Sequence, residues 1–288
     1  MIYSVLKLIR VHQWVKNGFV FAPVFFASRL NQSAVWGQMA IAFLAFSLMA
    51  SCIYVINDYV DIERDRLHPT KCQRPLASGA ITKPQAKGLV LLLLVLAVAL
   101  SITLPWPAIW IVLGYFVMNL FYSFKLKHIA ILDITIIAIG FLLRVFLGGV
   151  TTQVFISHWL IMLTFLLAMF LGLAKRRDEY LIYLQGKSTR TSIEGYNIDF
   201  INVAMMLTAS VTVVTYIMYT VSDEVIQRIG HSSLYITTIF VVLGILRYLQ
   251  QTLVFTQSAS PTKILLHDHF LQGIIGAWVI TFGYFLYV

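Results

Sequence analysis

The fold is decided by residues 35–66, which read VWGQMAIAFLAFSLMASCIYVINDYVDIERDR. The first 23 of these residues, 35–57, carry no charge, and a helix of about 20 apolar residues crosses the hydrocarbon core of a bilayer. The next nine residues hold six charged side chains. We therefore predict a membrane helix over residues 35–57 that ends in a polar, charged segment.

The whole chain has a composition typical of membrane proteins. Hydrophobic residues make up 59% of its 288 residues and charged residues only 11%, whereas about 25% of the residues in an ordinary soluble domain are charged. The apolar segments predict nine spans, over 17–30, 35–57, 86–104, 106–122, 130–150, 157–174, 200–221, 232–250 and 269–288. The sequence thus predicts an all-α integral membrane protein with one transmembrane catalytic domain, residues 1–288.

The basic residues are distributed unevenly between the two sides of these spans. Of the 21 Lys and Arg residues, only Arg29 and Arg228 fall on one side, and Arg144 lies within a span. Because basic loops stay in the cytoplasm, we expect the N-terminus inside, the C-terminus outside and a location in the inner (cytoplasmic) membrane. The loops 58–85, 123–129 and 175–199 are then expected to form the cap of an active site facing the cytoplasm.

Other functional classes find little support in the charge and cysteine patterns. The net charge of +9 is scattered over loops, without an aromatic platform or a nucleic-acid-binding module, so no nucleic-acid partner is expected. Attraction to anionic lipid head groups accounts for basic loops of this kind. Cys52 and Cys72 lack a second pair to complete a metal site, and we interpret both as plain thiols.

The acidic residues after the second predicted span form a column. No helix stop signal precedes Pro69, so Asn57, Asp58, Asp61 and Asp65 should share one helical face. At 100° per residue, Asp61 lies about 60° and Asp65 about 20° from Asp58 around the axis. Mg²⁺ prefers one or two carboxylates plus phosphate oxygens, so the column predicts a magnesium site.

A solvated helix end is the alternative interpretation of this column. In that case the carboxylates would only form salt bridges to nearby basic side chains, for which the candidates are Arg64, Arg66 and Lys71. The sorting of the acids to one side of the helix favours the metal site, because charges in a solvated run usually alternate around a helix.

The stretch NDYVDIERDR, residues 57–66, resembles the aspartate-rich motif N-D-x-x-D-x-x-x-D of the UbiA superfamily of intramembrane prenyltransferases. The resemblance implies a nine-transmembrane-helix UbiA-type bundle that binds Mg²⁺ and a diphosphate at a cytoplasmic opening. It also implies catalytic roles for Asp58, Asp61 and Asp65. The second acidic motif of that superfamily, D-x-x-x-D, is missing from GLAKRRDEYLIY, residues 172–183, which carries Lys175, Arg176 and Arg177 instead.

Further stretches are similar to the decaprenyl-phosphate phosphoribosyltransferases, a branch of the same superfamily. They are RVHQWVKN (10–17), DRLHPTKCQRPLASG (65–79), YSFKLKHIAILD (122–133), GFLLRVFLGG (140–149) and AKRRDE (174–179). The resemblance implies transfer of 5-phosphoribose from phosphoribosyl pyrophosphate to a decaprenyl or undecaprenyl phosphate, with release of diphosphate, toward lipid-linked D-arabinofuranose for the cell envelope.

Several polar residues near the inner helix ends are predicted to bind these anionic substrates. Guanidinium and ammonium groups grip phosphate oxygens, and a hydroxyl can bond the ribose. The predicted substrate-binding residues are Lys16, Asn17, Arg66, Lys71, Arg74, Tyr122, Ser123, Lys125, Lys127, Lys175 and Arg176. For Arg144, deep within a span, we favour a structural pairing with a neighbouring helix or a subunit contact over donor binding. Asp133 could pair with Lys125, Lys127 or the metal.

Two other functions stay open at this point. An aromatic prenyltransferase would use the same metal site with a prenyl diphosphate, although the missing D-x-x-x-D motif counts against it. A transporter would place its polar breaks at mid-membrane in two related halves, whereas the polar clusters here lie at helix ends. The sequence also leaves open whether loop 67–85 closes as a lid, how long the isoprenoid is, and whether the chain forms a homo-oligomer.

Overall fold

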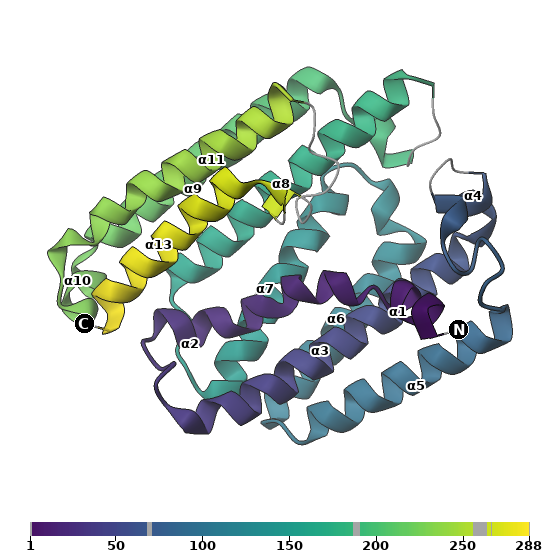
Figure 1. Ribbon diagram of the computed structural model, residues 1–288, viewed down its shortest axis with the longest axis horizontal. Coiled ribbons are helices and arrows are strands. Elements are labelled where there is room, and N and C mark those ends of the chain that lie inside the picture. The colour runs from purple at the N-terminus through teal and green to yellow at the C-terminus, as the bar shows by residue number, and fades with distance from the viewer. Residues whose placement is uncertain (1, 68–70, 187–190, 256–263, 266, 288) are drawn as a thin grey trace. The chain divides into compact units, whose positions relative to one another are not determined.

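The computed structural model describes residues 2–67, 71–186, 191–255, 264–265 and 267–287, and every regular element in these ranges is a helix (Figure 1). Parts of two predicted loops, residues 68–70 and 187–190, therefore lie outside the described residues. The chain divides into two compact units. Unit 1 comprises Met1–Leu126 and Leu143–Ile156, and unit 2 comprises Lys127–Leu142 and Ser157–Val288.

Unit 1 is organised around α3 (Ser33–Val60), which packs along α5 (Lys83–Ile102) and also contacts α1, η1 and α6. In the most apolar 18-residue stretch of α3, 61% of the residues are buried, compared with 22% in that of α5. Small residues such as Ala42, Ala45 and Ser47 are fully buried on α3, and small side chains let neighbouring helices approach closely in a membrane. The other elements are α1 (Ile2–Ile9), η1 (Val11–Phe21), α2 (Ala22–Phe26), α4 (Ile62–Arg66), η2 (Lys71–Gln73), α6 (Trp106–Phe124) and the second half of α7 (Leu132–Thr152).

One glycine fixes the path of the first segment of unit 1. A Cβ added to Gly148, on α7, would lie 1.9 Å from the carbonyl oxygen of Val20, on η1. No side chain fits into that space, so the backbone of η1 can lie directly against α7 only because position 148 is glycine.

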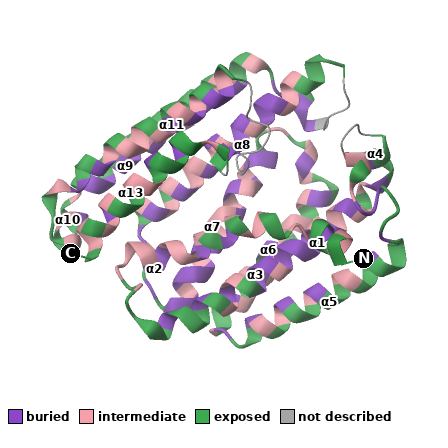
Figure 2. Cartoon of the chain, in the orientation of Figure 1, coloured by how far each residue is buried: buried purple, intermediate pink, exposed green. Residues whose placement is uncertain are grey.

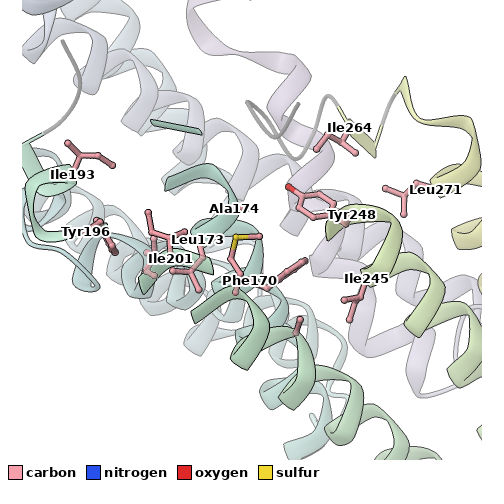
Figure 3. Packing of buried hydrophobic residues seen from close by; sticks show 13 residues of the cluster. Phe170, Leu173, Ala174, Ile193, Tyr196, Ile201, Ile245, Tyr248, Ile264 and Leu271 are labelled. Carbon is pink, nitrogen blue, oxygen red and sulfur yellow. The ribbon is translucent and has the colours of Figure 1, made fainter. Parts of the chain in front are cut away.

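Unit 2 contains the first half of α7 and the remaining long helices. Contacts join α8 to α9, α9 to α11, and α11 to α13. Its core includes Phe170 and Leu173 from α8, Ile201 from α9, Ile245 from α11 and Leu271 from α13, which are labelled in Figure 3. The elements are α8 (His158–Leu184), η4 (Thr191–Gly195), α9 (Ile198–Val221), α10 (Asp223–Ile229), η5 (Ser232–Thr237), α11 (Thr238–Leu253) and α13 (His269–Tyr287), with η3 (Leu126–His128) at the boundary.

The described residues contain eight helices that are long and apolar enough to cross a membrane, so the chain is a multi-pass membrane protein. Exposed residues recur along α5 (Figure 2). They include the large apolar residues Leu91, Leu92 and Val95, which are all more than half exposed. A bilayer, unlike water, solvates such a surface without cost. The all-α membrane fold predicted from the sequence is confirmed.

The predicted count of nine spans is not confirmed. The first predicted span, 17–30, is not one long helix but the end of the 3-10 helix η1 followed by the five-residue α2. Two features of the sequence explain this difference. Asn17 is buried and its side chain is used in hydrogen bonds, and Pro23 stands in the first turn of the new helix α2, which begins at Ala22.

The end of α8 also differs from the prediction. We expected the span to end at residue 174 and a loop to follow over 175–199, but α8 continues to Leu184. Arg176, Arg177 and Asp178 are buried on this extension. Because Arg176 and Arg177 find partners inside unit 2, the helix does not have to end where the apolar run ends.

Candidate active site

The acidic column lies where α3 passes into α4, in unit 1. α3 ends at Val60, and Asp61 forms a turn before α4 begins at Ile62. Two backbone bonds still follow the helical pattern, because the amide of Asp61 donates to the carbonyl of Asn57 (3.0 Å) and that of Asp65 to the carbonyl of Asp61 (2.8 Å). The predicted common face is therefore kept through the turn.

Asp58 and Asp65 converge on a single guanidinium group. Arg74 Nη1 lies 3.0 Å from Asp58 Oδ1 and 2.7 Å from Asp65 Oδ2. A second arginine, Arg10, places its Nη2 2.5 Å from the same Asp58 Oδ1. Asp58 is 2% exposed and Asp65 3% exposed. We call this group of two carboxylates and two guanidinium groups the Asp–Arg cluster.

Arg10 reaches the Asp–Arg cluster from the junction between α1 and η1. Its backbone is left-handed, with φ 54° and ψ 51°, and its guanidinium lies over the ring of Tyr54 at 4.9 Å from the ring centroid. The hydroxyl of Ser51, on α3, donates to the carbonyl of Ile9 (2.8 Å) and accepts from the indole of Trp14 (3.0 Å). These bonds hold the junction against α3 and so position Arg10.

Arg74 reaches the cluster from the segment between η2 and α5. Its own backbone amide donates to the carbonyl of Lys71 (2.9 Å), and the amide of Ser78 donates to the carbonyl of Arg74 (2.9 Å). Lys7, on α1, donates to the carbonyl of Gln73 (3.1 Å). The segment is thus tied both to itself and to the N-terminal helix, which keeps Arg74 beside the acids.

The donor set of the cluster fits a hard divalent ion completed by a substrate. Among the described residues, no group of three His, Cys, Asp or Glu side chains could hold a metal by itself. Asp58 and Asp65 are nevertheless close enough together to contact the same atom, Arg74 Nη1. Mg²⁺ usually takes one or two carboxylates and fills its other positions with water and phosphate oxygens. Asp61, half-buried at the turn, lies between them in sequence.

A second polar network in unit 1 surrounds Arg144. Its Nε donates to Asn17 Oδ1 (2.8 Å), its Nη2 donates to the hydroxyl of Tyr115 (3.3 Å), and its guanidinium lies over the ring of Phe46 at 4.6 Å. Asn17 also donates to Ser47 Oγ (2.8 Å). Arg144 is only 5% exposed. The pairing with neighbouring helices favoured from the sequence agrees with these contacts.

Lys16, on η1, is affected by the charges of both Arg144 and Arg10. Burial, followed by the charges of Arg144 and Arg10, lowers the pKa of Lys16 to about 8. The same kind of environment, burial followed by the charges of Arg10 and Lys16, lowers the pKa of His12. This part of η1 therefore carries an excess of positive charge and would favour an anion.

The other residues of unit 1 that were predicted to bind substrate or metal differ in their contacts and in their exposure. Arg66 pairs with Glu63 (3.1 Å) and donates through Nε to the carbonyl of Ala77 (3.3 Å). Ser123 donates to the carbonyl of Asn119, four residues earlier on α6 (2.6 Å). The remaining ones are Asn57, Lys71 and Tyr122, which are half-buried, and Lys125, which is exposed.

Unit 2 holds the remaining predicted residues, Lys127, Lys175 and Arg176. Lys127 is buried and Lys175 half-buried. Arg176 Nε lies 2.8 Å from Asp133 Oδ2, and neither side chain is exposed. Arg176 also pairs with Glu179. Asp133 further accepts from the hydroxyl of Tyr196 (2.7 Å) and from that of Ser192 (3.2 Å).

Two further charged side chains of unit 2, Arg177 and Asp268, have polar partners within the unit. Arg177 donates to Asn202 Oδ1 on α9 (3.0 Å) and to the carbonyl of Thr252 on α11 (2.6 Å). Asp268 pairs with Arg247 (2.9 Å) and accepts from the amide of Leu271 (2.7 Å), which caps the start of α13. These contacts account for buried or partly buried charges without a substrate.

Arg10 is the residue of the Asp–Arg cluster that sequence reasoning missed. It opens the stretch RVHQWVKN, but a basic residue next to a predicted span is usually a topological anchor. The signal that could have found it is the excess of acids in the column, because buried carboxylates require cationic partners. Arg64 and Arg66, which are nearer in sequence, are exposed instead.

Comparison with known proteins identifies the family. The UbiA prenyltransferase family matches residues 18–263 of the chain. The chain belongs to the UbiA prenyltransferase family. It is thus related to transferases, as predicted from the aspartate-rich motif.

Individual relatives and solved structures cover nearly the whole chain. A decaprenyl-phosphate phosphoribosyltransferase of Mycolicibacterium smegmatis is 33% identical over 298 aligned positions, covering 100% of this chain and 93% of the relative. One of Corynebacterium glutamicum is 31% identical, covering 96% and 84%. The structure of a UbiA homologue from Archaeoglobus fulgidus, bound to GPP and Mg²⁺, has a TM-score of 0.72 at 17% identity and 98% coverage of both chains. The UbiA-type fold expected from the sequence is therefore confirmed.

Proposed function

We propose that this protein transfers 5-phosphoribose from phosphoribosyl pyrophosphate to a polyprenyl phosphate and releases diphosphate. The observation that carries the proposal is the Asp–Arg cluster, in which two buried carboxylates face two arginines, in a chain 33% identical over its full length to a decaprenyl-phosphate phosphoribosyltransferase. Carboxylates suit the metal of a metal–diphosphate, and arginines suit its phosphate oxygens.

The proposed chemistry makes one bond and breaks one bond. An oxygen of the lipid phosphate forms a bond to C1 of the ribose, and the bond from C1 to the diphosphate oxygen breaks, with the electron pair leaving on diphosphate. The acceptor phosphate is already ionised at neutral pH, so no general base is required. The protein then contributes chiefly by positioning the two substrates and stabilising the negative charge that develops.

Magnesium is part of this proposal. Asp58 and Asp65 would hold the ion, with Asn57 and Asp61 as the other predicted ligands, and the ion would stabilise diphosphate as a leaving group. Around it, Arg74, Lys71 and Lys16 would neutralise the phosphates of the substrates. Tyr122 and Ser123 would contact the ribose or its 5-phosphate.

The predicted residues of unit 2 are assigned separately. For Lys127 and Lys175 we keep the proposed contact with substrate phosphates. For Arg176 we propose a structural role instead, because it is fully buried against Asp133 and Glu179. Removal of either partner from such a pair leaves an uncompensated buried charge.

The setting of the reaction follows from the same proposal. Positive-inside topology supports a location in the cytoplasmic membrane, with the N-terminus and the active site on the inner side. The product would be a polyprenyl-phosphoryl-phosphoribose, which supplies lipid-linked D-arabinofuranose for the cell envelope. Residues 1–288 would act as one catalytic domain.

The test compares two donor–acceptor pairs in membranes that contain the protein. One reaction receives labelled phosphoribosyl pyrophosphate and polyprenyl phosphate, and the other receives a labelled prenyl diphosphate and hydroxybenzoate. We expect labelled lipid only in the first reaction, and its loss when EDTA removes divalent ions. Product only in the second would identify an aromatic prenyltransferase, and no diphosphate release in either would favour a transporter.

A further inference from the structure

Two arginines share one oxygen of the Asp–Arg cluster. Asp58 Oδ1 is contacted by Arg10 Nη2 at 2.5 Å and by Arg74 Nη1 at 3.0 Å. The same Arg74 atom lies 2.7 Å from Asp65 Oδ2. The carboxylates are almost fully buried, whereas the side chains of Arg10 and Arg74 are 23% and 28% exposed. The two arginine side chains are thus the accessible members of the cluster, and the formal charges of the four groups cancel.

This pairing opposes a metal ion that arrives alone. An ion bound to Asp58 and Asp65 would lie within about 5 Å of Arg74, given metal–oxygen distances near 2.1 Å. The two positive charges would repel each other, and the burial of the carboxylates leaves little water to screen them. The ion would therefore have to displace Arg74, and with it one of the charges that stabilise the buried acids.

A diphosphate that binds together with the ion would make displacement of the arginines favourable. Guanidinium groups bind phosphate oxygens with paired hydrogen bonds, so each arginine that leaves an aspartate gains an equivalent anionic partner. Arg10 is well placed for such an exchange, because its guanidinium lies over the ring of Tyr54 at 4.9 Å from the ring centroid and its side chain is partly exposed. Metal and diphosphate then neutralise the acids and the arginines together.

We infer that Arg10 and Arg74 are diphosphate-binding residues that exchange Asp58 and Asp65 for the donor's phosphates. The exchange makes the binding of the divalent ion and of the diphosphate mutually dependent. The inference deepens the proposed function and rests on it only in requiring a diphosphate donor. It assigns a substrate contact to Arg10, and to Arg74 a second role as the group that holds the metal position closed.

Equilibrium dialysis of the purified full chain in detergent tests the exchange without any turnover. Radiolabelled Mn²⁺ and inorganic pyrophosphate are followed separately and together, with correction for the complex they form in solution. For the unmodified protein we expect weak binding of Mn²⁺ alone and at least tenfold tighter binding with pyrophosphate. Orthophosphate in place of pyrophosphate should give a much smaller gain.

The decisive variant is Arg74→Gln, with Arg64→Gln as a matched control. Arg64 is exposed on α4, next to Asp65 in sequence, and its loss removes the same charge. Arg74→Gln should bind Mn²⁺ alone at least tenfold tighter than Arg64→Gln, and pyrophosphate should add little to it. Introducing Asp58→Asn into Arg74→Gln should abolish the gain, which locates the ion at the cluster.

The inference is overturned if Arg74→Gln binds Mn²⁺ alone no more tightly than Arg64→Gln. Should Arg74→Gln not be recovered in folded form, Arg10→Gln carries the same test, because it removes the other contact on Asp58 Oδ1. The result separates this inference from the proposed function. Synergy without phosphoribosyl transfer would leave the exchange intact for another diphosphate donor, and transfer without synergy would overturn the exchange alone.

Discussion

Asn17 and Arg144 are joined by a hydrogen bond of 2.8 Å, although 127 residues separate them in sequence. Asn17 is 1% exposed and Arg144 5% exposed. Asn17 also donates to Ser47, so one amide group connects η1, α3 and α7 within unit 1. A buried arginine in a membrane helix depends on such polar partners.

Loss of this amide should destabilise the protein. We expect Asn17→Leu to lower the free energy of unfolding by about 1–3 kcal/mol, because the buried Nε–H of Arg144 would lose its acceptor and remain desolvated without a hydrogen bond. Thermal unfolding in detergent measures the change. Gln13→Leu, on the same 3-10 helix and only partly buried, is the control and should have little effect. Equal melting temperatures for the two variants would contradict the role of Asn17.

The close approach of η1 to α7 predicts a strong effect at Gly148. Gly148→Ala would place a methyl group 1.9 Å from the carbonyl oxygen of Val20, and overpacking of this kind costs about 1–3 kcal/mol or more. Gly114→Ala, on α6, is the matched control because nothing lies within 4 Å of its Cβ position. We expect a lower melting temperature for the first variant and an unchanged or higher one for the second.

The fold was predictable wherever hydrophobic length alone decides a structure. The spans of α3, α5, α6, α7, α9 and α13 lie within a few residues of their predicted positions. The prediction failed where individual polar residues change the outcome. Asn17 and Pro23 interrupt the first apolar segment. Beyond residue 174, α8 continues because Arg176 and Arg177 have partners inside unit 2, which hydropathy does not reveal.

The candidate site was predictable in part. The spacing of Asp58 and Asp65 placed both carboxylates on one face, and the structure brings both to Arg74. The contribution of Arg10 was not predictable, because it depends on a left-handed turn and on Tyr54, both of which are tertiary features. The catalytic and substrate-binding roles of these residues stay predictions.

Lys16 should make substrate binding depend on pH. Its pKa of about 8 means that it is charged below pH 8 and neutral above it. If Lys16 contacts a phosphate, KM for phosphoribosyl pyrophosphate should rise about tenfold between pH 7 and pH 9, since a hydrogen bond from a charged group contributes roughly 1.5–3 kcal/mol. Arginine stays protonated over this range, so Lys16→Arg should remove the rise. An identical pH profile in the variant would assign the effect to another group.

The lowered pKa of Lys16 also predicts how the stability of the fold depends on pH. A lysine whose pKa is lowered in the folded state binds its proton less tightly there than in the unfolded chain. Protonation of Lys16 therefore disfavours folding fully below pH 8, and the penalty declines as the pH rises from 8 toward the ordinary value of 10.5. Lys16→Met should unfold at a higher temperature than the unmodified protein at pH 7, with a smaller difference at pH 10.

Arg176 should affect stability rather than substrate affinity. Arg176→Ala leaves Asp133 buried and lacking its ion-pair partner, which we expect to cost about 3–5 kcal/mol. The combined variant Arg176→Met with Asp133→Leu removes both charges and should recover much of the loss. KM for phosphoribosyl pyrophosphate should stay within about twofold of normal in the combined variant. A tenfold rise in KM at preserved stability would instead support the substrate contact predicted from the sequence.

The central claim is phosphoribosyl transfer at a metal site built on Asp58 and its neighbours. Mass spectrometry of the lipid made by the purified protein from phosphoribosyl pyrophosphate, a defined polyprenyl phosphate and Mg²⁺ tests it most directly. We predict that polyprenyl phosphate gains one phosphoribosyl group, and that Asp58→Ala or Asp61→Ala forms none of this product while remaining folded. Full product formation by either variant, or unaltered polyprenyl phosphate with the unmodified protein, would contradict the claim.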